Sequence, residues 1–111
     1  MNGKVFQMFG DNKVPLGMVT NGKINGKWTS WYKNGQKDRE EHYKDGKEDG
    51  LHTFWYENGQ KEMERNFKDG KLDGLSTGRK PNGKKESDIN YKDGKIDGLT
   101  TFWYESGQKK Q

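Results

Sequence analysis

The sequence lacks cysteine altogether and has only two prolines among its 111 residues. Without cysteine, no disulfide and no thiolate metal site can form. Hydrophobic residues are also scarce, at 26% of the chain against 34% charged residues, and the aliphatic content falls in a range typical of disordered proteins. These shortages exclude a thick aliphatic core.

Long hydrophobic runs are missing as well. Residues 1–19 contain scattered apolar side chains, but no run long enough for the core of a signal peptide or for a membrane span. Taken as a complete chain, the sequence therefore predicts a cytoplasmic protein.

Aromatic residues and glycines, in contrast, are plentiful. The chain has four Trp, five Tyr, five Phe and sixteen Gly, and its net charge of +4 is too low to expand it by repulsion. An aromatic-rich sheet is compatible with this composition.

The glycines recur with a period of 24 residues. Asp-Gly or Asn-Gly pairs end at Gly22, Gly46, Gly70 and Gly94; a second class comprises Gly26, Gly50, Gly74 and Gly98; a third comprises Gly35, Gly59, Gly83 and Gly107. A fixed period of this length indicates a repeat architecture. Three aligned classes in four copies predict one structural unit per 24 residues.

Each unit is predicted to be a β-hairpin. Asn-Gly and Asp-Gly are the favoured pairs for two-residue type I′ turns, which need positive φ at both positions. The segments between them are short and rich in strand formers, as in residues 51–56, and residues 61–68 alternate between two faces. We therefore expect an all-β fold, an elongated single-layer antiparallel β-meander of repeated hairpins.

The turns also predict a register. With a turn at Asn58-Gly59, Phe54 opposes Met63 and Tyr56 opposes Lys61; with a turn at Asp69-Gly70, Phe67 opposes Leu72. One face would then carry Phe54, Met63, Phe67 and Leu72, and the other Leu51, Thr53 and Trp55. Alternatively, the second glycine class marks a bulge that shifts this assignment.

We expect one domain, residues 1–111. Residues 1–21 fit the period poorly and are expected to form a degenerate cap that covers the first edge of the sheet. Full repeats would span 22–45, 46–69 and 70–93, followed by a partial repeat, 94–111. At the C-terminal end, either a lysine-guarded edge strand or a cut from a longer array is expected.

The repeated strings resemble a known family. GKINGKWTSWYKNGQKDREEHYKDGK and GKEDGLHTFWYENGQKEMERNFKDGK share the pattern GKxxG…WYxNGQ…YKDGK with the variant MORN repeat (membrane occupation and recognition nexus), and above all with the bacterial YwqK-type antitoxin group. The resemblance covers residues 21–108. It implies an open sheet of hairpins without catalytic residues, binding to phospholipid or protein, and, for the antitoxin group, neutralisation of a toxin.

The third copy departs from this pattern. Residues 78–81 read Gly-Arg-Lys-Pro where residues 54–57 and 102–105 read Phe-Trp-Tyr-Glu.

Aromatic pairs are the first candidates for partner binding: Trp31 and Tyr32, Trp55 and Tyr56, Trp103 and Tyr104. They would either hold the sheet together by packing or form an exposed ladder that grips a partner, because a single layer cannot bury both faces.

A basic tip is the second candidate. Arg79, Lys80, Lys84 and Lys85 surround the Asn82-Gly83 turn. They are either solvated lysines of a decayed repeat or a contact for an acidic partner or phosphate groups.

Catalysis, metal binding and cofactors are not expected. His42 and His52 are the only histidines, and neither belongs to a ligand-spaced cluster. Elsewhere lysines alternate with carboxylates and form no continuous basic stripe, so nucleic-acid binding is not expected.

Three functions remain at this point. The leading hypothesis is an antitoxin- or immunity-like protein that inhibits a partner protein such as a toxin or nuclease. The alternatives are a peripheral membrane module that binds anionic phospholipid headgroups, and a structural spacer in a longer array.

Overall fold

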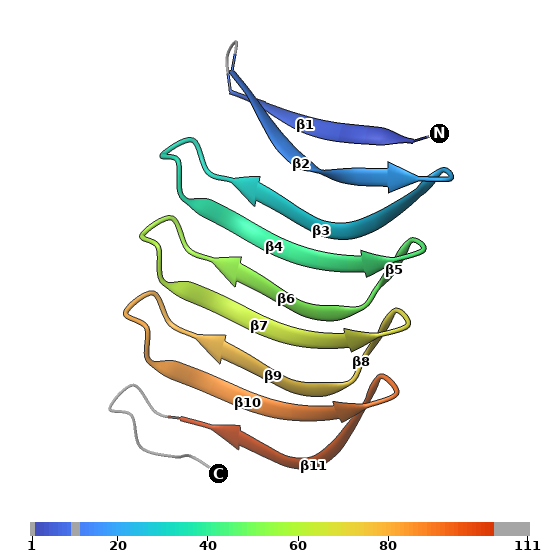
Figure 1. Ribbon diagram of the computed structural model, residues 1–111. Coiled ribbons are helices and arrows are strands. Elements are labelled where there is room, and N and C mark those ends of the chain that lie inside the picture. The colour runs from blue at the N-terminus through green and yellow to red at the C-terminus, as the bar shows by residue number, and fades with distance from the viewer. Residues whose placement is uncertain (1, 10–11, 104–111) are drawn as a thin grey trace.

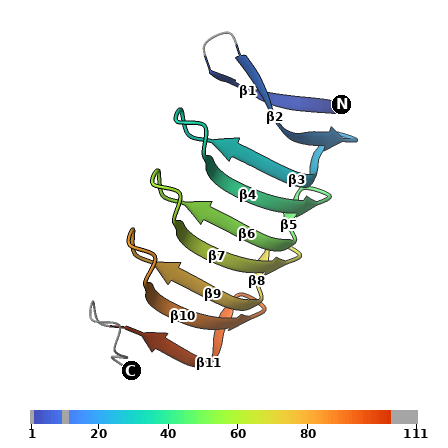
Figure 2. The same cartoon turned by 60° about the vertical axis from the view of Figure 1, so that its left-hand side comes forward.

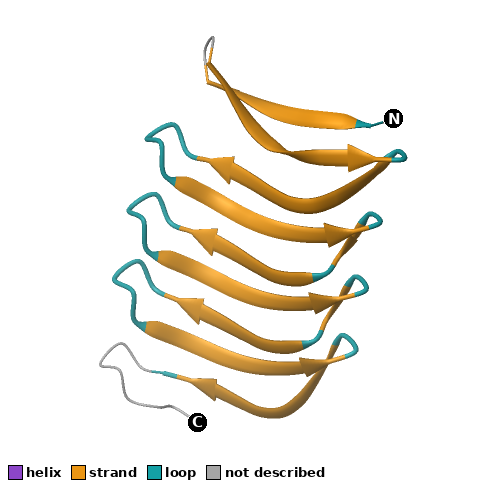
Figure 3. Ribbon diagram, in the orientation of Figure 1, coloured by secondary structure: helices purple, strands orange, loops and turns teal. Residues whose placement is uncertain are grey.

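The computed structural model describes residues 2–9 and 12–103, which form strands and short turns without a helix (Figures 1 and 3). The strands are β1 (Gly3–Phe9), β2 (Asn12–Thr20), β3 (Lys23–Trp31), β4 (Lys37–Lys44), β5 (Lys47–Glu48), β6 (Gly50–Trp55), β7 (Lys61–Lys68), β8 (Lys71–Leu72), β9 (Gly74–Arg79), β10 (Lys85–Lys92) and β11 (Lys95–Phe102).

All strands belong to one antiparallel sheet whose order follows the chain, β1-β2-β3-β4-β6-β7-β9-β10-β11, with β5 beside β4 and β8 beside β7. The Cα extents of 47 × 33 × 11 Å correspond to a single layer, and Figure 2 shows its curvature. The expected single-layer meander is confirmed. No hydrophobic side chain in the described part of the chain is fully buried.

The Asp-Gly turns are built as the sequence predicts. Asp45 and Gly46 have φ of 50° and 82°, and Asp69-Gly70 and Asp93-Gly94 repeat these values within a degree. Positive φ at both positions is the signature of a type I′ turn. These turns form the right-hand edge of the sheet in Figure 1.

The corners of the third glycine class, at Gly35, Gly59 and Gly83, differ from the prediction. At Asn58-Gly59 only the glycine has positive φ, and the loop is closed by the Tyr56 N–H, which donates to Gln60 O at 2.8 Å. The register shifts after Phe54, so Trp55, not Tyr56, opposes Lys61. The predicted Tyr56–Lys61 pair is therefore wrong, because a longer loop replaces the two-residue turn. The fourth corner, at Gly107, lies outside the described residues.

The second glycine class marks a bulge. Gly50 and Gly74 both have φ of 111°, and each follows an aspartate that interrupts the strand. The Asp49 N–H donates to His42 O at 2.9 Å, which bridges the interruption. Positive φ is costly for any residue with a Cβ, and glycine removes that cost.

The remaining predicted pairs are confirmed. Phe54 opposes Met63, and Phe67 opposes Leu72. One face of the sheet, which we call the histidine face, carries these side chains together with His52 and Tyr43. The opposite face, the threonine face, carries Leu51, Thr53 and Trp55, as the alternation along β6 predicts.

The first two strands form a hairpin that joins the repeats through β2 and β3. Gly17 lies against Trp28, so closely that an added Cβ would come within 2.5 Å of the indole ring. The Gln7 side chain donates to Trp31 O at 3.2 Å and accepts from Trp31 N at 3.1 Å. These contacts attach residues 3–20 to the first full hairpin.

Candidate binding surface

The tyrosines of the Trp-Tyr pairs connect successive repeats. The Tyr32 hydroxyl donates to Trp55 O, and the Tyr56 hydroxyl donates to Arg79 O at 2.6 Å. Burial, followed by nearby carboxylates, raises the pKa of both phenols above the usual value. Their hydroxyls therefore serve contacts within the chain. Tyr104 lies outside the described residues.

The asparagines of the loops repeat the same pattern. The Asn34 amide donates to Glu57 O and the Asn58 amide to Pro81 O, both at 2.9 Å. The side-chain oxygen of Asn58 accepts from Gln60 N at 2.9 Å within its own loop. The Tyr-x-Asn-Gly-Gln segment thus stacks each loop on the next.

The tryptophans are half-buried, and two of them lie beneath a lysine. Lys37 Nζ is 5.7 Å from the centre of the Trp55 ring, and Lys85 Nζ is 5.5 Å from that of Trp103. Both distances are in the range of cation–π attraction. Trp31 is also half-buried, and its backbone is held by the glutamine of β1. None of the three is fully enclosed, so part of each ring stays available to a partner.

A row of threonines and carboxylates crosses the sheet on the threonine face. Neighbouring strands place its members opposite one another in the order Thr29, Glu40, Thr53, Glu64, Thr77, Asp88 and Thr101. The four threonines are buried, and Thr77 Oγ1 donates to Asp88 Oδ1 at 2.7 Å. The 24-residue spacing within each residue type is visible in the sequence and could have revealed this row.

Lysines pair with the carboxylates of the row. Lys37 Nζ lies 2.8 Å from Glu40 Oε2, and Lys85 Nζ lies 3.3 Å from Asp88 Oδ2. The bond from Lys37 lowers the pKa of the Glu40 carboxyl. The lysines that cover the tryptophans are therefore held in place by the acidic row.

The predicted basic tip is only partly assembled. Arg79 Nε lies 3.7 Å from Glu64 Oε1, and Lys85 turns to Asp88 and Trp103. Lys80 and Lys84 join their backbones across the loop, and their side chains form no ion pair among the described residues. The four residues thus divide between the threonine face and the loop.

Two hollows adjoin on the threonine face, because both are lined by Trp55 and Gly59. One, of about 360 Å³, is completed by Gln60, Lys61, Arg79 and Gly83. The other, of about 340 Å³, is completed by Gln36 and Lys37. Sequence reasoning singled out Trp55 and Arg79 but did not place them together.

Exposed leucines complete this face. Leu51 and Leu75 are each 41% exposed and Leu99 is 71% exposed, at the same position of three successive units. Leu51 and Leu75 lie opposite Asn66 and Asn90. Large exposed apolar side chains in a row are typical of an interaction surface.

The histidine face is organised around a buried side chain. His52 is 1% exposed and its ring lies between those of Tyr43, at 5.5 Å, and Phe67, at 4.6 Å. Its Nδ1 is 3.7 Å from Glu41 Oε2, and its Nε2 is 2.8 Å from His42 O. Burial, with the neighbouring Glu41 carboxylate, raises the pKa of Tyr43 to about 12.

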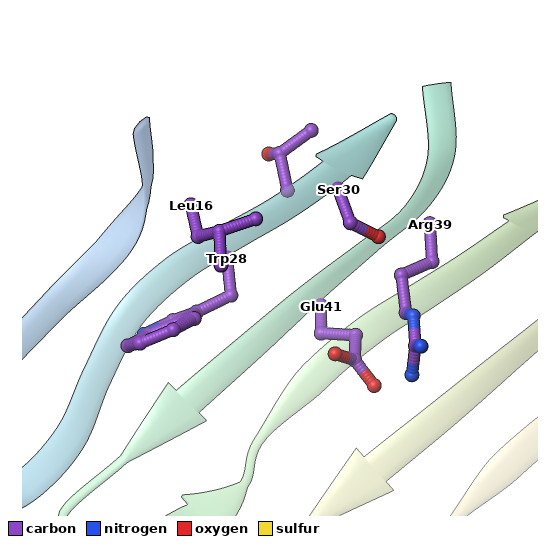
Figure 4. A pocket seen from close by; sticks show the side chains of 6 residues that line it. Leu16, Trp28, Ser30, Arg39 and Glu41 are labelled. Atoms are coloured by element: carbon purple, nitrogen blue, oxygen red, sulfur yellow. The ribbon is translucent and has the colours of Figure 1, made fainter. Parts of the chain in front are cut away.

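A third hollow, of about 190 Å³, lies near the first hairpin (Figure 4). Leu16 and Trp28 form its apolar side, and Arg39 and Glu41 its charged side. The buried Ser30 hydroxyl in this hollow has no hydrogen-bond partner.

Both nitrogens of His52 already face protein groups, and no group of three potential metal ligands occurs in the described ranges. Within residues 2–9 and 12–103, no helix is long and apolar enough to cross a membrane.

The model of the MORN repeat variant matches two adjacent segments, residues 24–45 and 48–69. They contain two successive copies of the Trp-Tyr-x-Asn-Gly-Gln loop. Repeats of this family are generally non-catalytic modules that bind proteins or membranes. No curated protein matches the chain.

Proposed function

We propose that this protein is a cytoplasmic, non-enzymatic binding module that covers part of a partner protein with its threonine face. In the form that the sequence resemblance favours, it acts as an antitoxin- or immunity-like inhibitor of a toxin or nuclease. Inhibition of this kind needs no catalytic group, only a surface that blocks the partner.

The observation that carries this proposal is the row of exposed leucines beside tryptophans on one face of a single-layer sheet. Leu51 precedes Trp55 by four residues on the same face of β6, and Leu75 occupies the position of Leu51 in the next repeat. Tryptophan and arginine are the residues that most often dominate protein interfaces, and apolar side chains around them exclude water. The threonine face therefore carries both tryptophans and exposed leucines that a partner protein can contact.

Charge pairing favours a protein over a membrane as the partner of this face. Its lysines are paired with Glu40, Glu64 and Asp88, whereas anionic lipid attracts clusters of unpaired basic residues. Lys80 and Lys84 are the observation that supports the second candidate, a peripheral membrane module that binds anionic headgroups.

Affinity purification from the native host, together with flotation on anionic liposomes, tests the proposal. A stoichiometric protein that is lost when Leu51, Leu75 and Leu99 are all changed to Ser supports it. Phe102→Ser, an equally exposed apolar residue on the histidine face, serves as the control and should retain the partner. Salt-sensitive flotation without any captured protein would instead favour the membrane module.

A spacer role makes a third, distinct prediction for the same experiment. Neither a captured protein nor flotation would then be found, and the leucine variants would change only solubility.

A further inference from the structure

Arg79 stands at the position where the other copies carry Trp31, Trp55 and Trp103. Lys37 covers Trp55, and Lys85 covers Trp103, so the pattern pairs each such lysine with the tryptophan of the next copy. In the third copy, Lys61 meets a second cation instead of an indole ring. Its Nζ is 3.4 Å from Glu64 Oε2, while Arg79 Nε is 3.7 Å from Glu64 Oε1. Two cations therefore share one carboxylate.

The guanidinium of Arg79 is incompletely bonded. Its Nη1 donates to Gly83 O at 3.2 Å, but its Nε is buried and has no hydrogen-bond partner. The 3.7 Å contact with Glu64 is longer than a hydrogen bond and is electrostatic only. Because Nε is buried and the side chain as a whole is 29% exposed, a planar oxyanion would be received at the Nη end of the guanidinium, which can donate two parallel hydrogen bonds.

The surroundings of Arg79 are open and carry an excess of positive charge. The hollow of about 360 Å³ that it lines is in the size range of ligand sites, and two of its lining residues, Gly59 and Gly83, contribute no side chain. Lys61 and Arg79 line this hollow and share one carboxylate, that of Glu64, so these three side chains together carry one positive charge. One further carboxylate would balance that charge.

We propose that the hollow formed by Trp55, Lys61 and Arg79 binds a carboxylate side chain of an acidic peptide segment. Arg79 and Lys61 receive the carboxylate, and the Trp55 ring packs against the methylene groups that carry it. The inference rests on the proposed function only in taking a protein as the source of the anion. That choice follows from Leu51, which lies on the same face of β6 and offers an apolar contact that a free phosphate would not use.

Titration of the full chain with a synthetic peptide of alternating glutamate and serine tests the proposal. Fluorescence anisotropy of the labelled peptide reports affinity, and the NMR signal of the Trp55 indole N–H reports the place of binding. The expected result is binding that weakens with rising salt and shifts this indole signal. A peptide of alternating glutamine and serine should bind at least about tenfold more weakly, because it lacks the charge.

Two variants locate the site. Arg79→Trp introduces the residue that the other copies carry, so the sheet should fold, and the affinity should fall at least about fivefold. Lys61→Gln, which keeps a long polar side chain, should weaken binding in the same direction. Lys95→Gln, an exposed lysine on β11, is the matched control and should bind as the unchanged protein does.

The proposal is overturned if the unchanged protein does not bind the peptide, or if Arg79→Trp and Lys61→Gln bind it as tightly as the unchanged protein does. Binding of inorganic phosphate, or of vesicles containing phosphatidylserine, that depends on Arg79 when the peptide fails to bind also overturns it. The outcome is independent of partner capture: a captured protein that still binds Arg79→Trp leaves the proposed function standing and removes only this site. If the peptide binds here while no protein is captured, this site stands and the proposed function falls.

Discussion

The hydroxyl of Tyr56 donates a hydrogen bond to the backbone carbonyl of Arg79, 23 residues further along the chain. Tyr56→Phe removes this bond and leaves the carbonyl without its partner. We expect a loss of about 1 kcal/mol in the free energy of unfolding, measured by urea denaturation with circular dichroism. Tyr91→Phe is the matched control, because no hydrogen bond of that hydroxyl occurs within the described part of the chain. An equal loss in both variants would contradict the assigned role.

Lys80 occupies the place that Tyr32 and Tyr56 hold in the preceding copies. Its N–H closes the loop by donating to Lys84 O at 2.9 Å, as the Tyr56 N–H does to Gln60 O. A phenol at this position should therefore reach the carbonyl of Trp103. Lys80→Tyr should stabilise the protein by roughly 0.5–1 kcal/mol in the same denaturation experiment. Lys84→Tyr, in the same loop but exposed, should have little effect on stability. A similar gain in Lys84→Tyr would show that tyrosine stabilises this loop without the hydrogen bond to Trp103.

The burial of His52 predicts a contrast between the two histidines. His52→Ser uses the residue found at the equivalent position 76, but it removes the ring that Tyr43 and Phe67 contact. The expected loss is about 2–4 kcal/mol, since the vacated space cannot close fully. His42→Asn, which installs the residue found at positions 66 and 90, should stay within about 0.5 kcal/mol. Thermal unfolding of both variants checks the contrast.

The raised pKa of Tyr43 makes stability depend on alkaline pH. The pKa of about 12 in the folded protein lies above the ordinary tyrosine value of 10.0, so the fold favours the neutral phenol. Its stabilising contribution is complete below pH 10 and is lost as the pH rises towards 12, because the unfolded chain ionises first. Tyr32 and Tyr56 shift in the same direction and add to this loss. Tyr43→Phe should flatten the fall in unfolding free energy between these pH values and remove the latest step in tyrosine absorbance.

The contact between Gly17 and Trp28 predicts that the first hairpin can be detached by one methyl group. Gly17→Ala places a Cβ within 2.5 Å of the indole, a distance that requires the ring or the strand to move. Hydrogen exchange should then accelerate in residues 3–20 while β6 to β10 keep their protection. Trp28→Leu in the same chain should restore slower exchange by freeing space. No acceleration in Gly17→Ala would show that the ring moves at little cost.

The sequence predicted the features that glycine spacing controls. Asp45-Gly46 and its equivalents have the expected positive φ, and pairs such as Phe54–Met63 follow from counting outward from the corners. The Asn58-Gly59 loop escaped prediction because its geometry depends on a side chain that binds the next loop, not on the dipeptide alone. Contacts between adjacent repeats cannot be predicted from the sequence of one repeat alone.

Two residues of the candidate site were predicted from the sequence, but their proximity was not, because it depends on contacts between adjacent repeats. Trp55 and Arg79 are conspicuous in the sequence, but their proximity depends on the register between β6, β7 and β9. The burial of His52 could not be foreseen, because a lone histidine in a strand is equally compatible with an exposed position. Side-chain depth in a single layer depends on neighbours on both sides.

Because spatial order follows chain order from β1 to β11, each main strand of the described ranges needs only its predecessor as a template. Sequence-local pairing of this kind lowers contact order and favours rapid folding. The ribosome synthesises the strands in the same order in which they are added to the sheet. Each hairpin of the nascent chain can therefore form before the C-terminal residues have been synthesised.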